Sequence, residues 1–122
     1  MKRKVILFAL VASISVFSGA RAGELVCSGT VDMISFHANN TYMIKLSSMN
    51  VAVFFCSPDG THSVAGTSYV TGPETCKALI ATFLTARETG RNIYMYFDGT
   101  SVPATCNAWG NWTSANIRHF AY

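Results

Sequence analysis

Four cysteines, Cys27, Cys56, Cys76 and Cys106, are the feature that most restricts the fold of this chain. An even number of cysteines in a short exported chain predicts disulfides, here two. Three pairings are formally open and the sequence alone does not choose among them; we favour Cys56–Cys76 with Cys27–Cys106. Zinc is the alternative, but zinc ligands usually lie a few residues apart, whereas these cysteines are 20 to 30 residues apart.

The first 22 residues have the three parts of a secretory signal peptide. Basic residues occupy positions 2–4, an apolar run follows from position 5 to 12 and more weakly to 17, and Ala20 and Ala22 are small residues at the positions that a signal peptidase reads. We therefore expect cleavage after Ala22 and a secreted or periplasmic protein. Residues 23–122 are then a single domain, small enough for disulfides to matter to its stability.

The charge of the chain depends on which part is counted. The full sequence has a formal net charge of +3, but four of its nine Lys and Arg residues lie in the first 22 positions. Residues 23–122 keep five basic residues against six acidic ones, a net charge of −1. They offer no cluster of cations for nucleic acid and no apolar run of about 18 residues for a membrane span.

One helix is expected among several strands. Apolar residues recur at helical spacing from Cys76 to Leu84, Thr71 and Glu74 can form a capping box before them, and Gly90 is a usual helix stop. The helix is predicted over residues 73–89. Apolar patterns predict strands over residues 31–36, 42–46, 51–56, 62–70, 93–97, 105–109 and 117–122. A single helix between two groups of strands indicates a mainly β (α+β) fold or a small barrel.

Residues with catalytic potential are few and scattered. His37, His62, His119 and Lys45 could form an acid–base ribonuclease site only if the fold brought them together, and their spacing gives no reason for that. The common nucleophile, zinc-protease and phosphate-loop motifs are absent from the sequence. We expect no enzyme activity, no cofactor and no bound metal.

Aromatic residues are the stronger functional signal. Tyr94 and Tyr96 share one face of a predicted strand, and Trp109, Asn111 and Trp112 form a short segment typical of a loop. Flat aromatic rings beside Asn, Ser and Thr side chains suit the apolar faces and hydroxyls of sugars, and they are equally favoured at protein interfaces. The alternative is that both tryptophans complete a small core.

Two short motifs carry a resemblance to a known family. The first is Cys-Ser-Gly-Thr-Val at residues 27–31, followed by Phe36-His37, a polar turn and a strand that starts at Tyr42. The second is Thr-Gly-Arg-Asn-Ile-Tyr-Met-Tyr at residues 89–96. The first motif resembles the first strand of the B, or cell-binding, subunits of subtilase-cytotoxin, typhoid-toxin and pertussis-like bacterial toxins, and the second is similar to the end of that family's helix and the strand after it.

The resemblance implies a small OB-fold-like antiparallel barrel that assembles into a homopentamer, binds host cell-surface glycans such as sialylated ones, and delivers a partner A subunit. In that family a serine at the Ser-Gly step of the first strand contacts the terminal sialic acid, and that position is Ser28 here. The predicted glycan-binding residues are Ser28, His37, Tyr94, Tyr96, Trp109, Asn111 and Trp112. The alternative function is a secreted or periplasmic protein-binding module, such as a hydrolase inhibitor, that presents residues 109–112 to a partner.

Overall fold

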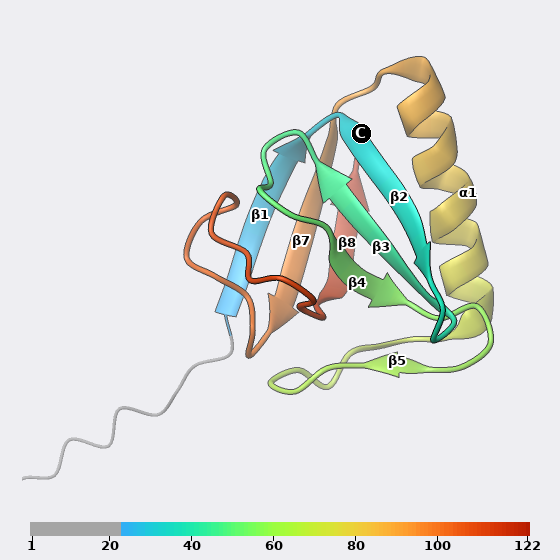
Figure 1. The fold of residues 1–122 in the computed structure, drawn as a ribbon, viewed down its shortest axis with the longest axis vertical. Coiled ribbons are helices and arrows are strands. Elements are labelled where there is room, and N and C mark those ends of the chain that lie inside the picture. The colour runs from blue at the N-terminus through green and yellow to red at the C-terminus, as the bar shows by residue number, and fades with distance from the viewer. Residues whose placement is uncertain (1–22) are drawn as a thin grey trace, which may run out of the picture.

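The computed structural model describes residues 23–122, so the predicted signal peptide lies outside the described residues. Within this range six short strands precede one helix and two strands follow it (Figure 1). No helix in residues 23–122 is long and apolar enough to cross a membrane. In chain order the elements are β1 (Gly23–Gly29), β2 (Val31–His37), β3 (Thr41–Leu46), β4 (Val53–Cys56), β5 (His62–Ser63), β6 (Val70–Thr71), α1 (Pro73–Thr89), β7 (Ile93–Gly99) and β8 (Asn116–Ala121).

The strands form two three-stranded antiparallel sheets and a two-stranded arm. One sheet has the order β1-β7-β8 and the other β2-β3-β4, while β5 pairs with β6. The helix α1 runs along one side of the strands, beside β2 (Figure 1). A parallel bridge links β4 to the segment just before β8, because Phe54 N–H donates to Thr113 O at 2.9 Å and Ala115 N–H donates to Phe54 O at 3.0 Å.

These pairings give an OB-like topology, in which one continuous stretch of chain belongs to both sheets. Only Thr30 separates β1 from β2, so this stretch pairs first with β7 and then with β3. The strands leave the barrel partly open. The predicted mainly β, OB-fold-like architecture, with its helix between two groups of strands, is confirmed.

Gly29 makes the bend between β1 and β2 possible. Its φ is +153°, and a Cβ at this position would collide with Ser47 Oγ. That oxygen accepts the Thr30 N–H at 3.2 Å, while Ser47 N–H donates to Thr30 O at 2.9 Å. Because Ser47 is held by both bonds, it cannot move aside freely, and glycine is required here.

A disulfide and aromatic packing hold α1 against the strands. Cys76 of α1 is bonded to Cys56 of β4, and both are fully buried. Phe83 lies edge-on to Phe55 and to Phe120, with ring centroids 5.6 and 5.3 Å apart. Aromatic pairs of this geometry add about 0.5–1.5 kcal/mol each beyond the burial of their surface.

The start of α1 and its buried face differ from the prediction. The N-cap is Gly72, without a side-chain cap, so the predicted capping box is wrong. The Thr71 hydroxyl donates instead to Asn116 Oδ1 at 3.3 Å, and Glu74 forms an exposed ion pair within the helix. Leu84 is 46% exposed because the buried face follows positions 76, 79, 83 and 86.

Two predicted strands are corrected by the structure. Residues 105–109 lie in an irregular loop between β7 and β8, where a disulfide and side-chain hydrogen bonds replace strand pairing. Residues 62–70 form strand only near their ends, as β5 and β6, which fold back on each other. In both segments tertiary contacts override a local preference for β-structure.

Buried polar side chains attach the β5–β6 arm to β7 and β8. Asp98, 4% exposed, accepts hydrogen bonds from Asn116 Nδ2 at 2.8 Å and from the Thr67 hydroxyl at 3.1 Å. His62 Nε2 lies 3.3 Å from Ala115 O. Burial lowers the pKa of His62 and outweighs the opposing effect of that hydrogen bond, so the ring is neutral at neutral pH and donates its Nε2–H.

The bend at Gly29 predicts that a single added methyl group there lowers the stability of the fold. Gly29→Ala is expected to lower the free energy of unfolding by about 1–3 kcal/mol, because alanine disfavours this φ and displaces Ser47 from its two bonds. Urea denaturation of the oxidised protein measures the change. Gly60→Ala is the matched control, since a Cβ there meets no atom within 4 Å, and equal stability of the two variants would contradict the role given to Gly29.

Candidate functional site

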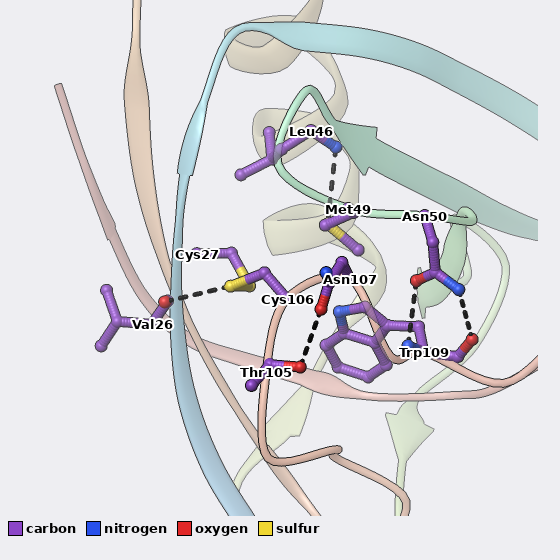
Figure 2. The surroundings of a disulfide bond; sticks show 9 residues. All are labelled: Val26, Cys27, Leu46, Met49, Asn50, Thr105, Cys106, Asn107 and Trp109. Carbon is purple, nitrogen blue, oxygen red and sulfur yellow. Dashed lines mark hydrogen bonds between the residues drawn. A yellow bond between two sulfur atoms is a disulfide. The ribbon is translucent and has the colours of Figure 1, made fainter.

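The loop between β7 and β8, which holds three predicted site residues, is fixed to the rest of the domain. The loop spans residues 100–115. Loops longer than about 12–15 residues without secondary structure are uncommon unless they are functional or mobile. The disulfide Cys27–Cys106 ties the loop to β1, with 5.7 Å between the Cα atoms (Figure 2). With Cys56–Cys76 this is the pairing favoured from the sequence, which is confirmed, and within residues 23–122 no cysteine remains free for zinc.

A pair of hydrogen bonds from one side chain is the second attachment of the loop. Asn50 Nδ2–H donates to Trp109 O at 2.8 Å, and Trp109 N–H donates to Asn50 Oδ1 at 2.9 Å (Figure 2). The Asn50 amide thus pairs with Trp109 as a neighbouring strand would. Both backbone groups of Trp109 are satisfied inside an irregular loop.

The side chain of Trp109 is a third attachment, because it belongs to the core. Trp109 is 3% exposed, and its ring lies edge-on to Phe97 with centroids 5.1 Å apart. Its Nε1–H is buried and has no hydrogen-bond partner in residues 23–122. A ligand at the surface cannot reach this ring, so Trp109 supports a binding surface only by anchoring the loop.

Trp112, three residues later, is 67% exposed and has an unusual backbone. Its φ of 61° is a left-handed conformation that is an outlier for a bulky residue. A tight turn holds it: the Thr113 hydroxyl donates to Gly110 O at 2.8 Å, and Thr113 O accepts the Phe54 N–H. The Trp112 ring stacks on Phe54 at 6.2 Å and 29°, and His37 lies edge-on to both rings at 5.4 Å.

A hollow of about 480 Å³ lies beside Trp112 and includes side chains of β2 and β3. Ser35, Met43 and Phe54 form a row across β2, β3 and β4, because they are paired in register. The hollow is lined by Met33, Ser35, Met43, Val51, Ala52, Asn111 and Trp112. We call these lining residues, together with His37 and Phe54, the Trp112 surface. It unites three of the predicted residues, His37, Asn111 and Trp112.

The other three predicted residues share a different face. Ser28 in β1 is paired with Tyr94 in β7, so their side chains are neighbours on one side of the sheet. Two residues along, Val26 is paired with Tyr96. Ser28 is exposed, and Tyr94 and Tyr96 are 51% and 44% exposed.

A hollow of about 540 Å³ adjoins this face at Tyr96. The ring of His119 lies edge-on to Tyr96 at 5.3 Å. Arg118 Nη1 is 2.6 Å from Glu24 Oε1, and its guanidinium lies over the Tyr69 ring at 5.1 Å. Because the paired side chains are largely exposed, the ion pair is weak and an anionic ligand can compete for Arg118. We call the group Val26, Ser28, Tyr94, Tyr96, Arg118 and His119 the Tyr96 surface.

Sequence reasoning missed the polar and apolar partners of these aromatic residues. His119 joins Tyr96 only through the register of β8 with β7, which contains a bulge after Tyr96. Ser35 and Met43 lie in strands that were predicted, but the path of the loop that brings Trp112 over them was not. The alternation of Met33, Ser35 and His37 along β2 was the available signal that these side chains share a face.

The structure does not form the three-histidine constellation of a ribonuclease. His37 lies in the Trp112 surface, His119 lies in the Tyr96 surface, and His62 is buried in the arm. Among the described residues no group of three or more His, Cys, Asp or Glu side chains could hold a metal ion.

Comparison of the chain with family models, with curated proteins and with solved structures gave no match. The class that the structure defines is a small, disulfide-bonded, OB-like domain with two separate aromatic surfaces. Its function then rests on the chemistry of those surfaces.

The Asn50 attachment leads to a prediction about the loop. Asn50→Ala is expected to lower the free energy of unfolding by about 1–3 kcal/mol, because it leaves the backbone N–H and C=O of Trp109 without partners. Faster proteolytic cleavage within residues 100–115 should accompany the loss. Asn107→Ala removes only an exposed bond from the Thr105 hydroxyl and serves as control; if it had the same effect as Asn50→Ala, the attachment would have no special role.

Proposed function

We propose that this chain is a secreted glycan-binding protein of the toxin B-subunit type and that the Tyr96 surface holds the sugar. The register of β1 with β7 carries the proposal. It places Ser28, which the family resemblance singles out, directly opposite Tyr94, which strand alternation singles out. Two independent sequence signals therefore meet at one exposed place.

The chemistry of the Tyr96 surface suits an acidic sugar. Tyr94 and Tyr96 provide apolar rings for the C–H face of a sugar, and their hydroxyls and that of Ser28 can donate or accept hydrogen bonds. Arg118 supplies a cation that can pair with a carboxylate in place of Glu24. A sialic acid combines an apolar face, hydroxyls and a carboxylate, so sialylated glycans are the favoured ligand class.

Export is the second part of the proposal. Both disulfides need an oxidising compartment in which to form and persist. This supports a secreted or periplasmic location, and cleavage after Ala22 stays a prediction.

Two substitutions test the Tyr96 surface. Ser28→Ala and Tyr94→Ala, made separately, are each expected to weaken binding to a sialylated oligosaccharide by about tenfold or more, because each removes a hydrogen bond or a stacked ring. A glycan array identifies the ligand, and isothermal titration calorimetry measures the affinity.

The control for this test is Ser63→Ala, which removes an exposed hydroxyl from β5 and should bind like the unmodified chain. Unchanged affinity in both Ser28→Ala and Tyr94→Ala would remove the Tyr96 surface from the proposal. An array without any bound sialylated glycan would overturn the proposed function itself.

Assembly into a ring of five, carrying a partner A subunit, is the further expectation from the resemblance. Phe36, Val70 and Leu84 are 46–60% exposed outside both surfaces, and burying them between subunits would stabilise such a ring. Size-exclusion chromatography with light scattering should give five times the chain mass, and five linked sites would raise avidity by about 10²–10⁴. A strict monomer at high concentration would favour the alternative, a protein-binding module such as a hydrolase inhibitor.

A further inference from the structure

We propose that the Trp112 surface is a second ligand site and that it binds an uncharged sugar ring. The inference does not depend on the proposed role of the Tyr96 surface, because neither Ser28 nor the two tyrosines line the hollow beside Trp112.

The backbone of Trp112 costs stability rather than adding to it. A left-handed backbone conformation costs a residue with a Cβ roughly 1–2 kcal/mol, so glycine or asparagine normally occupies such a position. Here the position holds a tryptophan that is 67% exposed, although its ring lies beside those of Phe54 and His37. Strained residues that persist at a surface cluster at ligand sites.

The backbone that carries Trp112 is held in place before any ligand arrives. The Cys27–Cys106 disulfide and the Asn50–Trp109 hydrogen bonds fix the loop before the turn (Figure 2). The backbone hydrogen bonds of Thr113 and Ala115 with Phe54 fix it after the turn. A ligand that stacks on the ring therefore does not have to order the loop, which lowers the entropic cost of binding.

The side chains around the ring match the two faces of a pyranose. The indole and the thioethers of Met33 and Met43 offer apolar contact, and the Asn111 amide and the Ser35 hydroxyl can each donate and accept. The hollow of about 480 Å³ falls within the usual range of about 300–1,000 Å³ for small-molecule sites.

His37 adds a hydrogen-bond acceptor at the rim of the site. Its Nδ1 is 3.0 Å from Asn39 Oδ1, which also accepts the Thr41 hydroxyl. Since an amide oxygen only accepts, Nδ1 carries the proton in the neutral ring and Nε2 keeps its lone pair. A sugar hydroxyl can donate to that nitrogen.

Charge separates the Trp112 surface from the Tyr96 surface. No residue that lines the hollow beside Trp112 is charged. Lys45, which lies on β3 two residues after Met43, is paired with Asp32 at 3.1 Å. The other hollow contains Arg118. The hollow beside Trp112 therefore offers no cation to a carboxylate, and a neutral hexose or N-acetylhexosamine is the ligand class that fits.

The test uses methyl glycosides of galactose, glucose, mannose, N-acetylglucosamine and N-acetylgalactosamine, titrated one at a time into ¹⁵N-labelled oxidised protein. At least one is expected to shift the Nε1–H resonance of Trp112 while leaving that of buried Trp109 in place. Trp112→Gly and Asn111→Ala should each weaken its affinity at least tenfold. Ser28→Ala and Tyr122→Ala, which alter exposed residues outside the site, should change the affinity less than twofold.

A stability measurement separates a binding role from a purely structural one. Trp112→Gly should leave Tm unchanged or raise it, because glycine accepts the left-handed backbone, and Trp112→Tyr should retain part of the binding. The proposal is overturned if Trp112→Gly lowers Tm by several degrees, if no neutral glycoside moves the Trp112 resonance, if only a sialoside does, or if Ser28→Ala abolishes the neutral-sugar binding as well.

Discussion

The structure depends on one stretch of chain that serves both sheets, and that stretch depends on the contact between Gly29 and Ser47. β1 pairs with β7 and β2 pairs with β3, and the change of partner takes place within the Gly29–Thr30 step. The backbone of Thr30 is bonded to Ser47 on both sides, so the two sheets meet at a fixed angle. The Ser28-Gly29 motif therefore has a structural role. Gly29 permits the bend and places Ser28 at the end of an exposed strand face.

The two aromatic surfaces follow from this architecture on different elements. The Tyr96 surface is a sheet face, set by the register of three neighbouring strands. The Trp112 surface combines a sheet face with a loop, and the loop is held in place by a disulfide, a side-chain amide and a buried indole. Trp109 and Trp112 thus have different roles in one short segment. The first anchors the segment in the core, and the second is exposed to solvent.

Local patterns predicted much of this molecule. The helix over residues 73–89 agrees with the structure because helical spacing is a property of a single segment. The OB-like fold was expected from the family resemblance, and the cysteine count predicted two disulfides whose pairing agrees with the one favoured among three. The grouping of six of the seven site residues into two surfaces, with Trp109 in the core, did not follow from the sequence. It depends on the register of β1 with β7 and on the path of residues 100–115, and both are set by contacts between distant parts of the chain. The failed cap at Thr71 has the same cause, since its hydroxyl is taken by Asn116.

The order in which the chain is made delays the Cys27–Cys106 disulfide. These cysteines are 79 positions apart, whereas Cys56 and Cys76 are only 20 apart. Contacts between distant positions form late and slowly in folding, so Cys27 keeps a free thiol until β7 and the loop after it have been made. During that wait Cys56 is the nearest wrong partner for Cys27. Closing the Cys27–Cys106 disulfide then fixes the loop that carries Trp112. A formed Trp112 surface therefore indicates that oxidative folding is complete.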